Sequence, residues 1–248
     1  MIEIKGISKT FGRKCLFDNI SATINDGESV AIIGRSGIGK SVLLKHMSGL
    51  IFPDSGIINI DNKEINKQTF KQLQDIRTKI GVVFQFGALL DSLTVAGNIN
   101  LALRKLTNLT NNEINDRIDY VLDEVGMLES KHLKPNELSG GMIKRVSIAR
   151  AIAGKPHYLL YDEPTTGLDP LMVETINQLM KKIHDDGNIT SIIVTHELKT
   201  IFDVSNRVLM LDDAKIIYDG SPHRMKDSSV ELVKNFVSSA YINRGIDI

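Results

Sequence analysis

The first sixty residues alternate apolar and polar positions with the period of β-strands. Such runs cover Ile2–Ile7, Phe17–Ile24 and Val30–Ile32, and a fourth, Ile57–Ile60, follows a cluster of turn-forming residues. An apolar residue at every second position is typical of a strand that buries one face. The amino-terminal part is therefore predicted to be mostly β-sheet.

Helical spacing of apolar residues replaces this alternation further along the chain. A helix is predicted over Gly39–Leu50, directly after the strand Ser29–Ile33. From Leu89 to Ala153 the pattern is helical throughout, and Thr110 with Glu113 forms a capping-box pattern ahead of an apolar helix face. We expect a helical subdomain over about 89–153.

The last third of the chain alternates strands with helices. Two short apolar runs, Tyr158–Tyr161 and Ile189–Val194, flank a helical pattern over Leu171–Ile183. Strand, helix and strand at this spacing predict a parallel sheet. A second capping-box pattern, Ser228–Glu231, predicts a carboxy-terminal helix and tail over 228–248 that docks on the body of the protein or on a partner.

Composition narrows the class of protein. The 248 residues are 42% hydrophobic and 24% charged, which is typical of a folded chain, and 30 Lys plus Arg balance 30 Asp plus Glu. The balance gives no global attraction for nucleic acid. Apolar runs are much shorter than the roughly 20 residues that span a bilayer, and the amino terminus lacks a secretory signal, so a cytosolic protein is expected. The single cysteine, Cys15, forms no internal disulfide.

Residues 34–41, Gly-Arg-Ser-Gly-Ile-Gly-Lys-Ser, match the phosphate-binding pattern GxxxxGK[ST] between a predicted strand and a predicted helix. Glycines let backbone N–H groups curl around phosphate oxygens, Lys40 would neutralise the β and γ phosphates, and Ser41 offers an oxygen to Mg²⁺. The alternative is a glycine-rich turn before a core helix. The candidate nucleotide-binding residues are Gly34, Arg35, Ser36, Gly37, Ile38, Gly39, Lys40, Ser41 and Val42.

Two acids end the predicted strand Tyr158–Tyr161. A buried parallel strand ends in Asp162 and Glu163 where its carboxyl edge faces a ligand. Asp162 would hold Mg²⁺, and Glu163 would orient the attacking water and accept its proton. The alternative is a helix-capping aspartate followed by a solvated glutamate.

Leu138–Gly141, followed by a helix through Lys144 and Arg150, resembles the ATP-binding-cassette (ABC) signature. The resemblance extends over nearly the whole chain, with the motifs in the expected order. It implies an α/β P-loop NTPase (RecA-like) core with an amino-terminal antiparallel β subdomain and an inserted α-helical subdomain, forming one ATP-binding domain over 1–240.

The resemblance also implies roles for single residues. Gln85 looks like the Q-loop residue that reaches the metal, Asp169 in Gly167–Pro170 looks like the D-loop, His196 looks like the switch histidine, and Phe11 takes the place of the aromatic that stacks on adenine. Each has an ordinary alternative. Gln85 and His196 can be surface or capping residues, Phe11 can be a core aromatic, and Asp169 can cap the next helix.

A homodimer is a further implication. ABC subunits pair head to tail, so each ATP would lie between the phosphate cradle of one copy and Ser139, Gly140 and Gly141 of the other. Hydrolysis would remove charge from this interface and let the pair open. The resemblance thus implies a peripheral ATPase on the cytoplasmic face of the inner membrane, bound to a membrane permease.

Two departures from the common ABC pattern point toward one branch of the family. Met142 follows the signature glycines where glutamine is usual, and Phe86–Leu90 follow Gln85. With the cradle segment, these stretches resemble the ATPases of maintenance-of-lipid-asymmetry (Mla) and mammalian-cell-entry (Mce) transporters. This implies a hydrophobic cargo such as phospholipid, and a small regulatory subunit for which the helix around 230–237 is a candidate contact.

Two other functional classes stay open at this stage. One is an ABC protein outside transport, a nucleotide-gated clamp in DNA repair or translation, although the chain lacks a long heptad insertion and basic extensions. The other is a phosphotransferase in which Glu163 activates a substrate hydroxyl instead of water. The residues do not identify the cargo, its direction of transport or the permease, because cargo is chosen by other subunits.

Overall fold

The computed structural model describes the backbone of residues 1–244 and the side chains of residues 1–238, and it contains two β-sheets. The smaller sheet has the strand order β2-β1-β4-β5 and is antiparallel throughout. Its strands are β1 (Ile2–Phe11), β2 (Lys14–Ile24), β4 (Ser55–Ile60) and β5 (Lys63–Glu64). Every apolar alternation predicted before residue 25 lies in this sheet, which confirms the antiparallel amino-terminal part.

The larger sheet has the order β10-β9-β3-β8-β7-β6. Its strands are β3 (Ser29–Gly34), β6 (Ile80–Val83), β7 (Tyr158–Asp162), β8 (Thr190–Val194), β9 (Arg207–Asp212) and β10 (Lys215–Gly220). Neighbours from β9 to β6 pair in parallel, and β10 returns antiparallel to β9. The predicted parallel pairing of β7 with β8 is confirmed, whereas the hairpin β9–β10 was not expected from the sequence.

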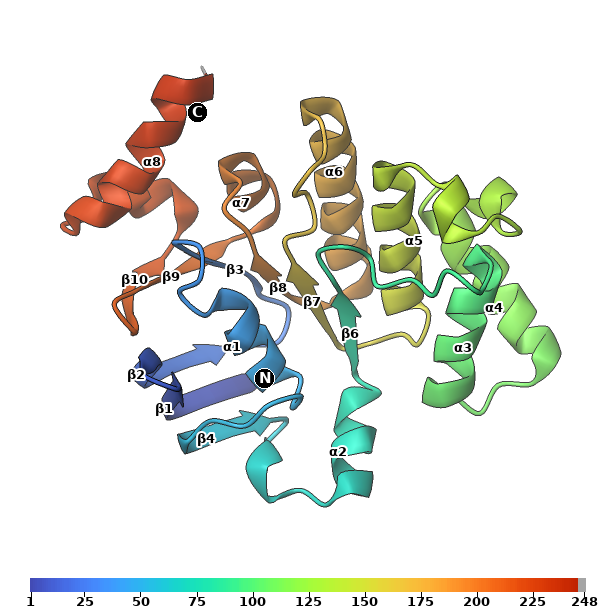
Figure 1. Cartoon of the computed structure of the whole chain (residues 1–248), viewed down its shortest axis with the longest axis horizontal. Helices are drawn as coiled ribbons and strands as arrows, with labels where there is room; N and C mark the ends of the chain where they lie inside the picture. The colour runs from blue at the N-terminus through green and yellow to red at the C-terminus, as the bar shows by residue number, and fades with distance from the viewer. Residues whose placement is uncertain (245–248) are drawn as a thin grey trace.

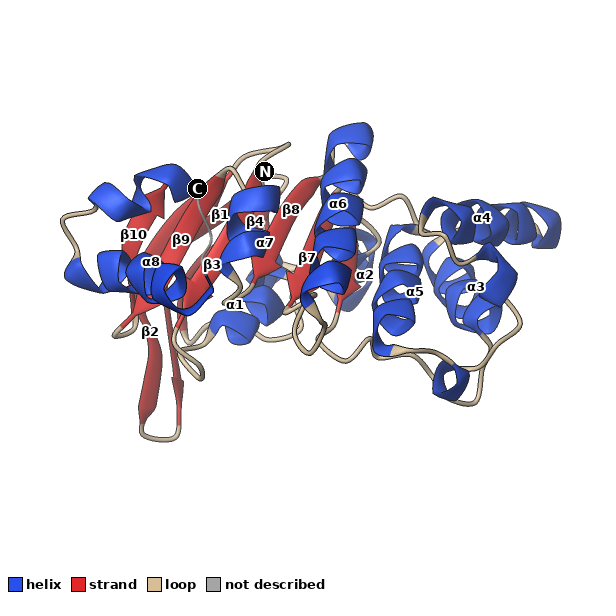
Figure 2. Ribbon diagram, turned by 90° about the horizontal axis from the view of Figure 1, so that it is seen from above, coloured by secondary structure: helices blue, strands red, loops and turns tan. Residues whose placement is uncertain are grey.

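Eight α-helices are described, and Figure 2 shows them on both faces and at one end of the larger sheet. They are α1 (Lys40–Met47), α2 (Phe70–Arg77), α3 (Val95–Leu106), α4 (Asn111–Glu124), α5 (Gly140–Ile152), α6 (Pro170–Gly187), α7 (Leu198–Val204) and α8 (Glu231–Arg244). Helix α1 is shorter than predicted because Gly39, with φ 113°, is its N-cap and Ser48 is its C-cap.

Helices α3, α4 and α5 lie together at the end of the molecule away from the antiparallel sheet (Figure 1). The capping box of Thr110 and Glu113 is present at the start of α4, as predicted. Residues 89–94 form a loop, so the helical part begins at α3. Its buried side chains share one apolar cluster with Tyr161 of β7 and Ile193 of β8, so this part packs directly on the sheet.

The carboxy-terminal helix packs on the body of the protein. Val233 and Val237 of α8 are buried in a cluster with Ile33 of β3 and Met210 of β9. The helix begins at Glu231, later than the capping-box pattern predicts, and the Ser228 hydroxyl accepts a hydrogen bond from the Val230 N–H instead. Residues 245–248 of the predicted tail lie outside the described residues.

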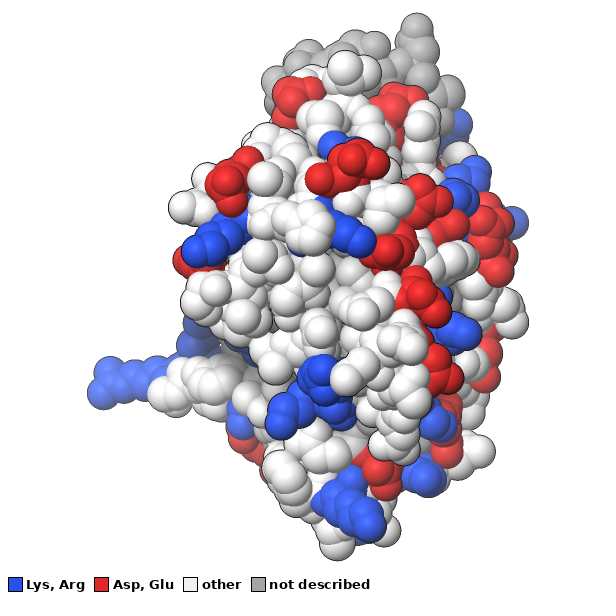
Figure 3. Space-filling model, turned by 90° about the vertical axis from the view of Figure 1, so that its right-hand side faces the viewer, with Lys and Arg blue, Asp and Glu red and all other residues white. Residues whose placement is uncertain are grey.

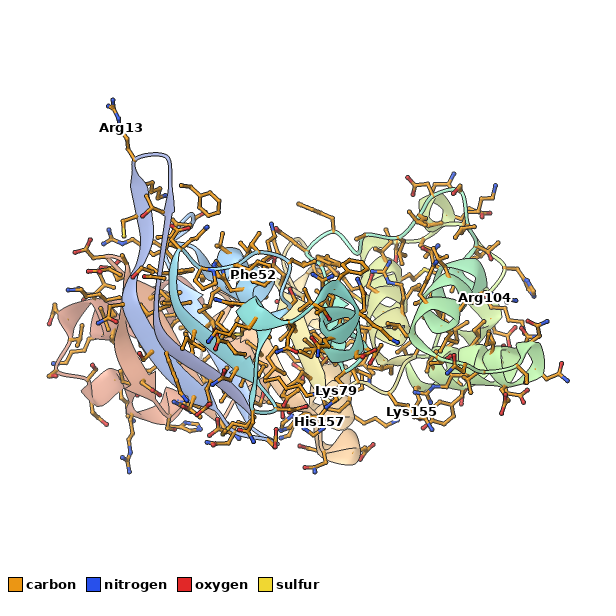
Figure 4. The ribbon with its side chains drawn as sticks, turned by 90° about the horizontal axis from the view of Figure 1, so that it is seen from below. Arg13, Phe52, Lys79, Arg104, Lys155 and His157 are labelled. Carbon is orange, nitrogen blue, oxygen red and sulfur yellow. The ribbon has the colours of Figure 1, made fainter. Side chains whose placement is uncertain are left out.

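The surface mixes charges of both signs. On the face seen in Figure 3, Lys and Arg are interspersed with Asp and Glu around a central area of uncharged side chains. The β1–β2 hairpin projects from the body and carries Arg13 at its tip, pointing away from the other labelled side chains (Figure 4). Within residues 1–244, none of the helices combines the length and the apolar character that crossing a bilayer requires.

Candidate active site

The phosphate-binding loop connects β3 to α1, at the carboxyl edge of the parallel sheet, where ligands bind in open α/β folds. Two of its glycines have no room for a side chain. A Cβ on Gly34, which has φ 142°, would lie 2.4 Å from the Leu211 carbonyl oxygen, and one on Gly39 would lie 2.9 Å from the Phe17 ring. The loop therefore keeps its backbone open for an anion only with glycine at these positions.

Lys40 lies inside this loop and is 8% exposed. Its Nζ donates to the carbonyl oxygens of Gly34, at 2.8 Å, and Arg35, at 3.1 Å. Burial lowers the pKa of the Lys40 ammonium, and the charges of Glu163 and Asp162 oppose that shift. The loop thus holds a desolvated cation among backbone carbonyls, where a phosphate oxygen would be a stronger partner.

Ser41 and Asp162 meet across the start of α1 and the end of β7. The Ser41 hydroxyl donates to Asp162 Oδ1 at 2.7 Å. Burial raises the pKa of the Asp162 carboxyl, and the hydrogen bond from Ser41 opposes the shift. Hydroxyl and carboxylate oxygens are ligands that Mg²⁺ accepts, so the pair fits this ion. No group of three or more His, Cys, Asp or Glu in the described part could hold a metal by itself, so phosphate and water oxygens would complete the shell.

Glu163 lies at the end of β7 in a left-handed backbone conformation, with φ 51°. Its N–H donates to the Val194 carbonyl of β8 at 2.9 Å. Its Oε2 accepts from the Thr166 hydroxyl at 2.9 Å and lies 2.9 Å from His196 Nδ1. A non-glycine residue in this region costs about 1–2 kcal/mol, which is typical of functional positions. The ends of β7 and β8 thus hold a carboxylate beside an imidazole.

An open cavity of about 890 Å³ unites most of these groups. The predicted residues that line it are Gly34, Arg35, Ser36, Gly37, Gly39, Lys40, Ser41, Val42, Gln85, Glu163 and His196. Five further lining residues were not predicted, namely Leu16, Met210, Leu232, Asn235 and Phe236. The last three belong to α8, almost 200 residues from the loop, and no sequence pattern connects segments so far apart.

Apart from the signature residues and Asp169, three predicted residues do not line the cavity. Ile38 packs against the apolar core, and Asp162 reaches the site through Ser41. Phe11 lies at the end of β1, 49% exposed, with Lys9 Nζ 5.2 Å from its ring centroid. Phe11 is thus not a core aromatic, and its stacking on adenine stays a prediction.

The signature residues lie apart from this cavity. Ser139 is the N-cap of α5, its hydroxyl accepts the Met142 N–H at 3.3 Å, and Ser139 and Gly140 are exposed. Asp169 is the N-cap of α6 and accepts from the N–H groups of Leu171 and Met172. The capping alternative for Asp169 is confirmed, and its contact with nucleotide stays a prediction.

Sequence reasoning missed the contacts that two basic residues of α5 make. Lys144 Nζ donates to the carbonyl oxygens of Gln85 and Glu163. Arg150 donates to the carbonyl oxygens of Gly87 and Ala88. Basic residues on a helix with mostly buried neighbours were a signal of internal partners, but the partners are 19 to 63 positions away.

Comparison with known proteins agrees with this geometry. Residues 17–166 match the family model described as ABC transporter. The intermembrane phospholipid transport system ATP-binding protein MlaF of Haemophilus influenzae is 33% identical over 96% of this chain and 90% of its own. The arginine transport ATP-binding protein ArtM of Bacillus subtilis is 41% identical over 90% of this chain and 92% of its own.

Solved structures give the same result. The dimeric bacterial ABC transporter cassette MJ0796 superposes with a TM-score of 0.83 at 34% identity, over 90% of this chain and 99% of that one. A post-hydrolysis dimer of that cassette holds ADP and Pi, with a TM-score of 0.82. With the cradle, the carboxylates and these relatives together, the chain belongs to the ABC transporter family, as an ATP-hydrolysing subunit that uses ATP and Mg²⁺.

Proposed function

We propose that this chain drives a membrane transporter as a homodimer, with two ATP molecules held between the subunits. One observation supports this more than any other: the cavity contains the phosphate loop, Glu163 and His196, whereas the exposed Ser139 and Gly140 lie outside it. The start of α5 offers free N–H groups and a positive dipole end. Only a second copy of the chain can bring such a group to the open side of a bound triphosphate.

Within each site, different residues of this chain bind the phosphates, activate the water and hold the metal ion. Lys40 binds the terminal phosphates, and Glu163 accepts a proton from the attacking water while His196 keeps the carboxylate oriented. Ser41, Asp162 and Gln85 would hold Mg²⁺, which neutralises charge on the phosphates when bound. Phe11 would stack on adenine, and Asp169 would contact the nucleotide across the dimer interface.

A membrane permease has a suitable docking surface on this subunit. A groove of about 320 Å³ lies between β6 and helices α3 and α5, lined by Leu50, Val82, Phe84, Ala88 and Leu106 among others. Large apolar side chains rim it, and Phe86 beside Gln85 is 85% exposed. Exposed apolar side chains around a groove are typical of a protein contact. A short amphipathic helix of the permease would bind here, and a movement of the Gln85 segment would displace it.

We infer that the cargo is hydrophobic, with phospholipid as the first candidate. The MlaF relatives, alike over nearly the whole length, support this cargo. Relatives with higher identity over slightly less of the chain carry the names of arginine and methionine transporters, so amino acids are the competing class. The subunit would sit at the cytoplasmic face of the inner membrane, and a small regulatory subunit would contact α8 on its exposed side.

Three measurements test the proposal. Purified protein with Mg-ATP should release orthophosphate without any acceptor, and Glu163→Gln should reduce this release to a small residual rate. The same Glu163→Gln protein, expressed with an affinity tag, should then capture its permease from native membranes in ATP. The same complex rebuilt with the wild-type subunit, in detergent, should hydrolyse ATP faster with added phospholipid than with arginine or methionine. Stimulation by an amino acid alone would rule out the lipid assignment and leave the motor intact.

A further inference from the structure

Lys144 is buried where three segments of the protein meet. It lies in α5 and is 5% exposed, which is rare for a lysine, and among the described side chains its ammonium bonds to backbone carbonyls. Its ammonium donates to the Gln85 carbonyl, in the segment after β6, and to the Glu163 carbonyl at 3.1 Å, at the end of β7. One cation thus joins the helical part, the Q-loop segment and the backbone of the proposed general base.

We propose that Lys144 is a positioning residue for hydrolysis, which holds the backbone of Glu163 in the orientation that aims its carboxylate at the attacking water. The inference rests on the proposed role of Glu163 as general base. Glu163 has φ 51°, a conformation that the chain adopts at a cost for a residue with a side chain. A charge-assisted hydrogen bond to its carbonyl oxygen offsets part of that cost, and the Glu163 N–H is held separately by Val194.

The link also joins hydrolysis to the movement of the helical part. Lys144 follows Ser139, Gly140 and Gly141 by one turn of the same helix, so a shift of α5 moves the signature and the ammonium together. Glu163 directly follows β7 of the sheet, and Gln85 lies in the segment between the two parts. A subunit whose α5 is out of place would therefore lose the backbone support of its general base.

A nearby contact separates this role from simple loop tethering. Arg150, also in α5, holds the same segment through the Gly87 and Ala88 carbonyl oxygens, and neither of these bonds involves Glu163. If Lys144 only anchored the loop, losing either residue would have the same kinetic effect. If Lys144 acts through Glu163, losing Lys144 lowers kcat in a way that depends on the Glu163 carboxylate, whereas losing Arg150 does not.

The test compares turnover of Mg-ATP by full-length variants. Lys144→Met keeps the length of the side chain and removes its donors, and we expect kcat to fall about tenfold or more while KM for Mg-ATP stays within about threefold. Lys144→Arg should restore kcat to within about threefold of wild type, because it supplies donors again. Lys131→Met, which removes a half-buried lysine paired with Asp119 in the same part of the fold, should leave both constants unchanged.

A double-mutant cycle gives the deciding result. In a Glu163→Gln background, Lys144→Met should lower the residual rate by less than about twofold, whereas Arg150→Met should have the same effect in both backgrounds. A full tenfold loss from Lys144→Met in that background, or wild-type kcat for the single variant, would overturn the proposal. Should Lys144→Met melt far below wild type, Lys144→Gln replaces it in the same cycle. Wild-type turnover by Glu163→Gln alone would instead refute the general base.

Discussion

Tyr158 and Tyr161 are both fully buried in strand β7 and differ in what their hydroxyl groups contact. The Tyr158 hydroxyl donates to the Asp61 carboxylate. The Tyr161 hydroxyl, within the part of the chain whose side chains are described, has no hydrogen-bond partner. Burial raises the pKa of Tyr161, so it stays protonated and its donor stays unused.

This contrast predicts opposite effects of the same substitution. Tyr161→Phe should raise the free energy of unfolding by about 1 kcal/mol, because a buried unsatisfied hydroxyl is removed. Tyr158→Phe should lower it by about 2 kcal/mol, because the bond to a charged carboxylate is lost. Urea midpoints of the two variants measure the difference. A loss of stability in Tyr161→Phe larger than about 1 kcal/mol would indicate a partner for the hydroxyl.

His46 predicts a pH dependence of stability. It is fully buried in α1, its Nδ1 lies 2.7 Å from the Val42 carbonyl oxygen, and its ring packs edge-on against Phe17. Burial lowers the pKa of His46 below its usual 6.5. The unfolded chain then binds this proton more readily than the folded chain, so stability is full above about pH 6.5 and falls as the pH drops below it.

For one such group the free energy of unfolding falls by at most about 1.4 kcal/mol for each pH unit below pH 6.5. Wild-type protein should therefore have a lower urea midpoint at pH 5.5 than at pH 7.5. His46→Gln should show a smaller difference between the two pH values, whatever its stability at pH 7.5. An unchanged difference in the variant would place the dependence on other groups.

At the scale of elements, one side chain organises the loop between Gln85 and α3. Asn98 in α3 is buried, and its Oδ1 accepts the Leu90 N–H at 2.7 Å. Its Nδ2 contacts the carbonyl oxygens of Thr94 at 3.0 Å and Leu90 at 3.2 Å. The amide thus satisfies backbone groups of a loop that has no strand or helix of its own.

Asn98→Ala should lower the free energy of unfolding by about 2–3 kcal/mol, since several backbone groups lose their partner at once. Asn100→Ala, two residues further along α3, removes only an amide whose oxygen accepts from the exposed Arg104 side chain and should cost less than about 0.5 kcal/mol. Thermal midpoints of the pair check this. Equal losses would mean that helix propensity, not the loop, sets the cost.

At the scale of the whole molecule, the proposed dimer completes each site with Ser139 and Gly140 of the second chain. Glu163→Gln retains Lys40 and the cradle, so it should bind ATP and remain dimeric because hydrolysis no longer removes the bridging phosphate. Lys40→Ala lacks the buried cation and should bind ATP poorly and stay monomeric. Light scattering after size separation, with and without Mg-ATP, measures both. A monomeric Glu163→Gln protein in saturating ATP would count against the shared sites.

The sequence alone determined the local chemistry. Three features each depend on residues within eight positions of one another: the glycine loop, the acids ending β7 and the Thr110 capping box. The conformation and hydrogen bonds of such short segments can be predicted from their own residues. The apolar periods also identified most strands and the long helices. Their boundaries shifted by a few residues where caps such as Gly39 act.

Tertiary structure decided which distant segments meet. Strand β3 follows β1 and β2 in sequence, yet it is buried along its whole length and lies inside the parallel sheet, between β9 and β8. The packing of α8 beside the cavity, the bond between Glu163 and His196, and the two carbonyls that Lys144 holds join positions 19 to about 200 apart. Such contacts depend on how whole elements pack. The free energy gained from burial and from hydrogen bonding depends on the distance between two groups in space, and not on their separation along the chain.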